Sequence, residues 1–201
     1  MDRDPMPFLT SPASVTALIY SDGFAIDALM RCIAGYLASE GVALAGFLQL
    51  DLPRAGQSRC DMVLEELASG ERIQISESRG EHARGCRLDT RELARAEALA
   101  INAVERRPDL LLINKFGKTE AHGGGFRALL ACALERDVPV LIAVPARNIE
   151  AWRVFAADFS ADWLVAELHE ETAALCAKIG LDPVRRAVAT AQKLLNPARS
   201  S

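Results

Sequence analysis

The sequence predicts a three-layer α/β domain built on a mainly parallel sheet. Four short apolar runs have the length of strands that are buried on both faces: residues 15–20, 42–50, 110–113 and 138–144. Three longer segments between them carry apolar side chains at helical spacing: residues 25–39, 89–107 and 125–136. Strands that alternate with helices form a parallel sheet with helices on both faces, joined by right-handed crossovers.

The predicted helices have recognisable starts and stops. The first helix ends before Gly41, the residue type that best adopts the left-handed conformation after a helix. Asp89 is suited to cap the N-terminus of the second helix, and Glu92 is suited to reach back to that cap. Pro108 ends the same helix because it disfavours helical geometry at the preceding residue.

Residues 51–89 interrupt the alternation of strands and helices. Two runs, at residues 62–67 and 72–76, are separated by Ala68-Ser69-Gly70-Glu71 and predict a β-hairpin. Residues 77–84 are polar and predict a loop. We interpret 51–89 as an insertion, with a hairpin and a polar loop, into one α/β domain.

We expect that single domain to span residues 15–201, after a disordered leader at residues 1–14. A segment at 148–156 and a strand at 163–165 follow the last buried run of the sheet. A helical tail at residues 167–201 completes the chain.

Composition excludes several classes of protein. The 201 residues carry a net charge of −4, whereas nucleic-acid binding favours a basic face. No apolar run approaches the roughly 20 residues of a membrane span, and acidic residues near the N-terminus do not fit a signal peptide. The five cysteines are scattered without a CxxC or zinc spacing. We therefore expect a cytoplasmic protein that neither binds nucleic acid nor spans a membrane.

Several segments resemble known families. The run from Ser21 to Phe47, the hairpin at residues 62–76 and the loop Phe116-Gly117-Lys118-Thr119-Glu120 resemble the small P-loop nucleoside-triphosphatases of the thermophilic NTPase type. A closer resemblance is to a bacterial family, domain of unknown function 2478. That resemblance spans roughly residues 15–163 and is carried by three segments: Gly85-Cys86-Arg87-Leu88-Asp89, Asn114-Lys115-Phe116-Gly117-Lys118 and Pro139-Val140-Leu141. It implies a P-loop-NTPase-like fold and, because members are often encoded beside molybdate-transport genes, a link to molybdenum transport or molybdenum-cofactor metabolism.

The first functional motif of the P-loop enzymes, Walker A, is degenerate in this chain. A working P-loop, GxxxxGK[ST], places a lysine on the outer phosphates and a hydroxyl on magnesium. Alignment on the helix puts Ala25, Ile26 and Asp27 at its last three positions, after a loop that contains Gly23. Asp27 would repel a triphosphate while it stabilises the helix start. Three alternatives remain for this segment: it caps the helix, it forms a residual anion or nucleoside site, or it still binds a triphosphate.

The second motif, Walker B, has changed in the same direction. Asn114 and Lys115 stand where the related enzymes keep the acidic residues that hold magnesium and activate water. Asn114 lacks that negative charge and Lys115 reverses it. Both changes argue against ATP with magnesium as a ligand and against nucleotide hydrolysis.

The same changes suit an anionic ligand. Lys115 and Lys118 follow a strand, at the edge of the sheet where open α/β folds bind ligands. Three consecutive glycines then lead into a helix whose free N–H groups suit an oxyanion. Alternatively, the lysines are solvated, and Glu120 and His122 merely order the loop. The candidate ligand-binding residues are Gly23, Asn114, Lys115, Gly117, Lys118, Gly124 and Gly125.

A separate candidate is Cys86. It lies beside Arg87 and just before a helix start, conditions that lower the pKa of a thiol. Cys86 and Arg87 are thus a candidate reactive or soft-metal site, and the alternative is that Cys86 is simply buried.

The leading hypothesis for function is a non-hydrolytic binding or accessory protein. Its ligand would be an oxyanion, such as molybdate, or a phosphorylated small molecule. If the protein is instead an enzyme, it would be a divergent nucleotide-dependent hydrolase or transferase with Glu120 or Asp27 as the acid or base. A third hypothesis is a protein-interaction module on an inherited scaffold, with a protein as its partner.

Overall fold

The computed structural model describes residues 15–22, 25–39, 41–53, 60–77, 87–158 and 161–166. Within them the main sheet has seven strands in the order β4-β3-β2-β7-β8-β1-β9. The strand bounds are β1 (Val15–Tyr20), β2 (Leu44–Pro53), β3 (Cys60–Glu66), β4 (Arg72–Gln74), β7 (Leu110–Ile113), β8 (Val140–Pro145) and β9 (Ala161–Ala166). The five strands β2, β7, β8, β1 and β9 run parallel to one another, and β3 pairs in antiparallel fashion with both β2 and β4.

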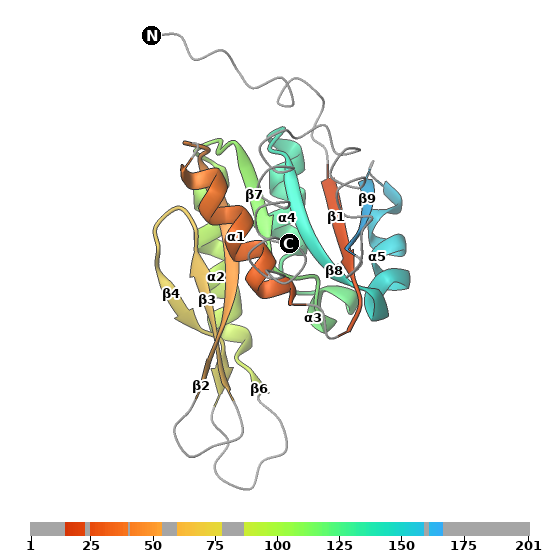
Figure 1. Ribbon diagram of the computed structural model, residues 1–201, viewed down its shortest axis with the longest axis horizontal. Coiled ribbons are helices and arrows are strands. Elements are labelled where there is room, and N and C mark those ends of the chain that lie inside the picture. Colours follow the sequence, from red (N-terminus) through yellow and green to blue (C-terminus); the bar gives the residue numbers. More distant parts are fainter. Residues whose placement is uncertain are drawn as a thin grey trace, which may run out of the picture.

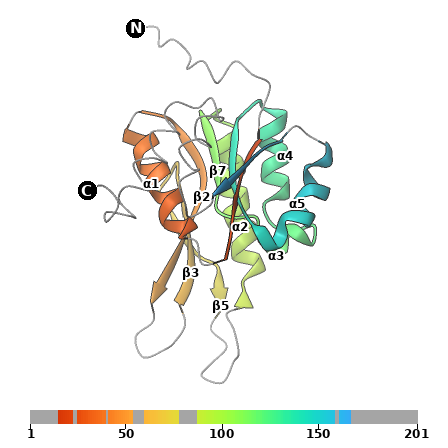
Figure 2. The same ribbon diagram turned by 45° about the vertical axis from the view of Figure 1, so that its right-hand side comes forward.

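Helices cover both faces of the sheet. Helix α1 (Ile26–Ser39) lies on one face, and α2 (Thr90–Val104), α4 (Arg127–Glu135) and α5 (Ile149–Phe155) lie on the other (Figures 1 and 2). Alternate residues of β7 divide between the two interiors: Leu110 and Leu112 pack with α1, and Leu111 and Ile113 pack with α2 and α4. The predicted three-layer α/β fold is therefore confirmed.

Local signals in the sequence account for the helix ends. Gly41 has a φ of +79°, and the N–H of Val42 donates to the carbonyl of Leu37, which closes α1 as expected. The carboxylate of Asp89 accepts from the N–H groups of Arg91 and Glu92 at 2.9 and 3.1 Å, which confirms the predicted cap of α2. The Glu92 carboxylate is directed elsewhere, to Arg95.

The predicted hairpin is present as β3 and β4, in which Leu64 pairs with Ile73. Its turn is held by the buried carboxylate of Glu66, which accepts from the N–H groups of Ala68 and Ser69 at 3.1 and 2.7 Å. Gly70 has a φ of +73°, a left-handed conformation that a glycine adopts without strain. The turn therefore lies at the predicted residues 68–71, and the structure adds the Glu66 carboxylate that holds it.

The surroundings of the hairpin differ from the prediction. Strand β2 continues to Pro53 and pairs with β3 from Phe47↔Glu66 to Pro53↔Cys60, so the hairpin extends the main sheet. The run predicted as one strand at residues 72–76 is broken, because the N–H of Ile75 donates to Met62 while β5 (Ser76–Glu77) pairs with β6 (Arg87–Leu88). Pairing between distant strands decided both features.

Three expectations fall wholly or largely outside the described residues: the leader at 1–14, the polar loop at 77–84 and the helical tail at 167–201. The segment at 148–156 forms α5, and the strand expected at 163–165 is part of β9. In the described part of the chain, no helix has the length and apolar character needed to cross a membrane.

Candidate functional site

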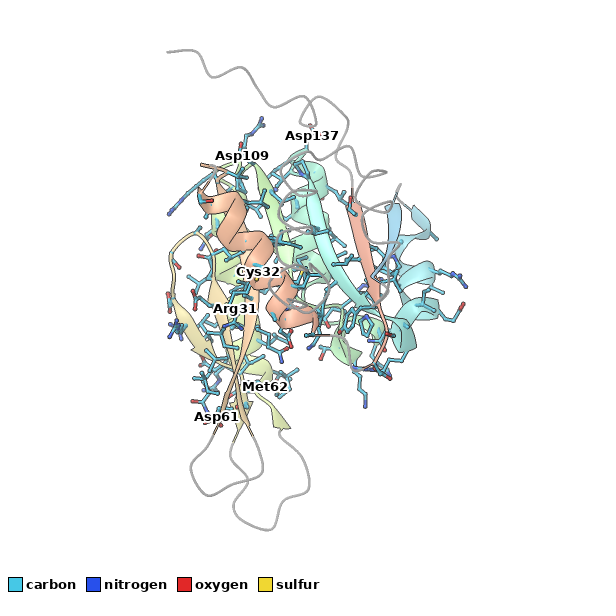
Figure 3. All side chains as sticks on the ribbon, in the orientation of Figure 1. Arg31, Cys32, Asp61, Met62, Asp109 and Asp137 are labelled. Carbon is cyan, nitrogen blue, oxygen red and sulfur yellow. The ribbon has the colours of Figure 1, made fainter. Side chains whose placement is uncertain are left out.

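Polar side chains gather where the parallel strands end. Asp22 follows β1, Asn114 and Lys115 follow β7, and Arg147 follows β8. Asp109 and Asp137 precede β7 and β8 and lie at the opposite end of the sheet (Figure 3). Since open α/β sheets bind ligands at the carboxyl ends of their strands, the first group marks the candidate site.

At the centre of this site, three predicted residues are in contact. Asp27 lies in the first turn of α1, and its Oδ1 accepts a hydrogen bond from Asn114 Nδ2 at 2.8 Å. The same oxygen lies 3.4 Å from Lys115 Nζ. The side chains of Lys115 and Asp27 are 24% and 33% exposed, so their ion pair faces solvent only in part.

One polar atom of the Asn114 side chain lacks a hydrogen-bond partner among the described residues. An ionised carboxylate only accepts hydrogen bonds, so the Asn114 NH₂ group must face Asp27 and its Oδ1 must face away. Asn114 is 1% exposed, and Oδ1 is buried without a hydrogen-bond partner among the described residues. A buried acceptor without a donor is costly, so this atom is suited to a ligand or water that supplies one.

Two further groups border the cluster. The ends of β1 and β8 are joined by an ion pair between Asp22 and Arg147. Burial, and next the negative charge of Asp27, raise the pKa of Tyr20 to about 12. The sequence did not single out Tyr20, which lies at the end of β1.

Glu120 has a structural position. It lies in α3 (Lys118–Ala121), a short helix where the sequence predicted a loop, and it is 5% exposed. Its carboxylate accepts from the N–H groups of Gly117 at 2.8 Å and Phe126 at 3.1 Å. Gly125 has a φ of +63°, and a Cβ there would lie 1.8 Å from Glu120 Oε1. The glycine turn is therefore shaped around this carboxylate.

The N-terminus of α4 is occupied by protein groups. Besides Glu120 at Phe126, Glu97 of α2 accepts from the N–H of Leu129 at 3.3 Å and from that of Ala128. Burial raises the pKa of Glu97. The N–H groups of Phe126, Ala128 and Leu129, at the helix start expected to bind an oxyanion, are therefore already bonded to carboxylates of the chain.

Beside the cluster lies a pocket of about 330 Å³. Its polar lining includes four predicted ligand-binding residues, Asn114, Lys115, Gly117 and Lys118, together with Gln49, Thr119 and Glu120. The rest of the wall is apolar and comes from β3, the segment after β4, β6, α2 and the start of α4: Met62, Leu64, Ile75, Leu88, Leu93 and Phe126. The sequence predicted the hairpin but not that it would form this wall, because its packing partner α2 is distant along the chain.

The remaining predicted residues do not join this site. Gly23 and Cys86 lie outside the described residues, as does the side chain of Arg87. Gly124 and Gly125 do not line the pocket. No group of three or more His, Cys, Asp or Glu in the described part of the chain is arranged to hold a metal ion.

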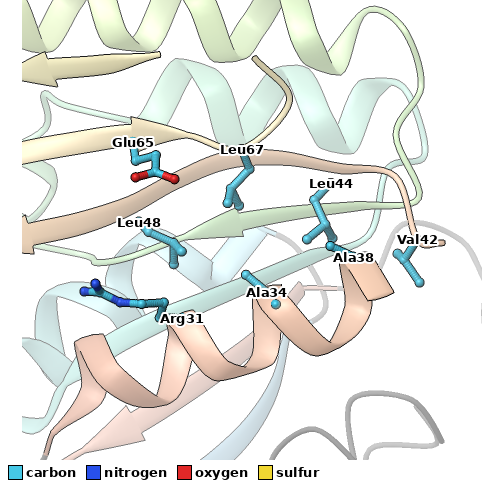
Figure 4. A pocket seen from close by; sticks show the side chains of 9 residues that line it. Arg31, Ala34, Ala38, Val42, Leu44, Leu48, Glu65 and Leu67 are labelled. Atoms are coloured by element: carbon cyan, nitrogen blue, oxygen red, sulfur yellow. The ribbon is translucent and has the colours of Figure 1, made fainter. Parts of the chain in front are cut away.

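A second hollow, of about 290 Å³, lies between α1 and the β2–β3 pair. Figure 4 shows Arg31 and Glu65 near one end and Val42 at the other. The other lining residues are apolar or, in the case of Gly35, have no side chain. None of them is a predicted site residue. We therefore place the candidate site in the pocket beside Asn114.

Comparison with known proteins supports the fold and decides the family. Residues 15–173 match the family described as "Protein of unknown function (DUF2478)". The chain belongs to this family. This confirms the predicted family.

One curated relative and one solved structure are similar to this chain. The "Molybdenum import ATP-binding protein ModC 2" of Bradyrhizobium diazoefficiens is 35% identical over 144 residues, which are 72% of this chain and 16% of that protein. The solution structure of a human cancer-related nucleoside triphosphatase matches with a TM-score of 0.55 and 16% identity, over 92% of this chain and 99% of that one. The second likeness supports the P-loop-NTPase-like fold alone.

Proposed function

We propose that this protein binds a small anionic ligand, an oxyanion or a phosphorylated molecule, without hydrolysing a nucleotide. The observation that supports this is the contact of Asp27 with Asn114 and Lys115 at the carboxyl end of the sheet. In this cluster the cation comes from the loop after β7, and a carboxylate stands in the first turn of α1.

The identity of these side chains disfavours hydrolysis. Ile26, which aligns with the P-loop lysine, is 2% exposed and carries no charge. Asn114 and Lys115 supply an amide and an ammonium group at the position where magnesium-dependent enzymes use carboxylates. Asp27 would further repel the phosphates of a nucleotide. The degenerate Walker A motif thus lacks the positive charge that balances the phosphates. The degenerate Walker B motif lacks the carboxylates that hold magnesium.

Two lysine side chains of the pocket are placed to attract an anion. Lys115 and Lys118 both line the pocket, and Lys118 is exposed. The enzyme alternative finds less support, since Glu120 is engaged by two backbone N–H groups and does not lie free as an acid or base. The similarity to a protein named for molybdenum import supports an accessory role in molybdenum transport or cofactor metabolism, with molybdate among the ligands to test.

The test is a thermal-shift and calorimetric panel with molybdate, tungstate, sulfate, phosphate, and ATP or GTP with magnesium. We expect stabilisation by at least one anion that needs no magnesium; ligand at 100 times its Kd stabilises by about 2.7 kcal/mol. Lys118→Ala should weaken binding, and Lys115→Ala should do so as well. Arg106→Ala is the matched control, because it removes one positive charge near the opposite end of the sheet.

Three outcomes would contradict the proposal. Magnesium-dependent binding and turnover of ATP or GTP, lost in Lys115→Ala, would favour the nucleotide enzyme. Equal losses in Arg106→Ala and Lys118→Ala would mean that only net charge matters. No stabilisation by any anion, with capture of a protein partner intact, would favour the interaction module.

A further inference from the structure

We infer that the preferred ligand is an organic monoanion whose flat, apolar body enters the pocket and presents an N–H or O–H donor to Asn114 Oδ1. This inference rests on the proposed function in that the ligand is a small anion, and it favours an organic anion over the inorganic oxyanions named there. It depends on three properties of the same pocket: its wall, its unpartnered acceptor and its charge.

The wall is suited to a hydrocarbon surface. Six of the lining side chains are apolar, and four of them, Leu64, Ile75, Leu93 and Phe126, belong to the hydrophobic core between the sheet and α2 and α4. A bare tetrahedral oxyanion needs hydrogen-bond donors on all sides and gains nothing from such a wall. The volume of about 330 Å³ is at the lower end for small-molecule pockets, which suits a body of one or two fused rings.

Asn114 defines the polar edge of the ligand. Asn114 lines the pocket, and its side chain is almost fully buried and oriented by the 2.8 Å hydrogen bond that its NH₂ group donates to Asp27. The unpartnered Oδ1 can only accept. A ligand with a donor on its ring edge satisfies this atom, whereas a ligand with only acceptors leaves it unpaired.

The charges define the anionic group. The ionisable side chains that line the pocket are Lys115, Lys118 and Glu120, and Lys115 is paired with Asp27 outside it. These four charges sum to zero, which is poor compensation for the two negative charges of molybdate or sulfate. Glu120 is already stabilised by two N–H groups, so the exposed Lys118 is left to attract a single negative charge at the rim.

This pocket differs in place from the phosphate cradle of a P-loop. That cradle would lie at the start of α1, on one face of the sheet, whereas the apolar wall of the pocket belongs to the core on the face covered by α2 and α4. Asn114 and Lys115 lie between the two, since they contact Asp27 of α1 and also line the pocket. The hairpin strand β3 supplies Met62 and Leu64, so the insertion builds part of the site.

The experiment is isothermal titration of the full chain with four probes. Indole-3-carboxylate has the ring, the N–H and the negative charge. Benzofuran-3-carboxylate replaces the N–H with an oxygen, indole lacks the charge, and sodium molybdate lacks the body. We expect indole-3-carboxylate to bind about tenfold or more tightly than molybdate or indole, and about fivefold more tightly than benzofuran-3-carboxylate, which leaves Asn114 Oδ1 without a donor.

A pair of variants tests the location. Met62→Trp places a larger side chain in the wall and should weaken indole-3-carboxylate by tenfold or more. Leu52→Trp makes the same kind of change at an exposed position of β2 and should not. The ligand series uses the wild-type chain, so it tests the inference even if Met62→Trp fails to fold.

Each remaining result overturns the inference. Molybdate binding as tightly as indole-3-carboxylate, with dependence on Lys118, would refute the organic ligand and leave the proposed function standing. Equal affinity for the indole and benzofuran acids would refute the role of Asn114. Equal effects of Met62→Trp and Leu52→Trp would refute the pocket. Failure of all four probes and of every inorganic anion would refute both proposals.

Discussion

Two carboxylates near helix N-termini, Asp27 at α1 and Glu120 before α4, have opposite surroundings. Asp27 is one-third exposed, and its partners are side chains, Asn114 and Lys115. Glu120 is 5% exposed, and its partners are backbone N–H groups. The same functional group is thus part of an open polar cluster at Asp27, whereas at Glu120 it is buried and holds two segments of backbone together.

The difference shows why residue type alone does not assign a role. A buried carboxylate bonded to backbone N–H groups cannot be removed without leaving those donors unsatisfied, which costs about 1–3 kcal/mol for each. A partly exposed ion pair contributes about 0–1 kcal/mol, so its members are free to serve a ligand. We therefore expect large effects on stability at Glu120, and small effects on stability but visible effects on binding at Asp27.

The largest effect is expected for Glu120→Ala. The substitution leaves the N–H groups of Gly117 and Phe126 without their acceptor and should lower the free energy of unfolding by about 3 kcal/mol. Urea denaturation measures this. Glu150→Ala, at a side chain that is 78% exposed, is the control and should change stability by no more than about 0.5 kcal/mol. A loss below about 1 kcal/mol at Glu120 would remove the contrast with Asp27.

Gly125→Ala should have the next largest effect. The new Cβ would overlap Glu120 Oε1 and the backbone is left-handed, so we expect a loss of about 2–3 kcal/mol. Gly123→Ala is the matched control, since its φ of +93° brings similar backbone strain but the nearest atom lies 3.9 Å away. It should cost only about 1 kcal/mol. If the two substitutions cost the same, the turn is not shaped around Glu120.

A double-mutant cycle sharpens this test. When Glu120 is already alanine, the overlap at Gly125 disappears, and Gly125→Ala should cost about as much as Gly123→Ala. Additive losses would show that the two residues act independently.

A smaller effect on stability, with a change in binding, is expected for Asp27→Asn. The carbonyl of the new side chain still accepts from Asn114, so the free energy of unfolding should change by less than about 1 kcal/mol. Lys115 loses its negative partner, and the affinity for an anion should rise about two- to fivefold, which calorimetry measures. Weaker anion binding in Asp27→Asn would mean that the carboxylate takes part in holding the ligand.

The smallest effect is a pH dependence at Glu97, the second carboxylate at α4. Its pKa is raised above the ordinary value of 4.5, mainly by burial and in part by the charge of Glu120. A raised pKa in the folded protein means that the stabilising contribution is fully present below the unfolded pKa and is lost as pH rises through the folded pKa. The stability of the wild type relative to Glu97→Gln should therefore fall as pH rises from about 4.5, and then level off. A difference that rises with pH would contradict the assignment.

Much of the fold followed from short stretches of sequence. The apolar runs predicted the parallel strands, Gly41 and Asp89 predicted helix ends, and the two runs on either side of residues 68–71 predicted the hairpin. These features depend on the conformational preferences and hydrogen bonds of near neighbours, which any chain with these residues carries locally. The pairing of β2 with β3 and the break at Ile75 could not be predicted from local preferences, because both depend on hydrogen bonds to another strand.

The candidate site divides in the same manner. The sequence by itself determined that Lys115 and Asn114 replace acidic residues and that both follow a strand, and those facts led to an anionic ligand. Only the tertiary structure decided that the Asn114 amide nitrogen bonds to Asp27 across 87 residues of chain, that the Asn114 side-chain oxygen is left unpaired, and that Glu120 has a structural position. The physical reason is that burial and hydrogen-bond partners arise from packing between distant elements, whereas charge and local propensity belong to the residues themselves.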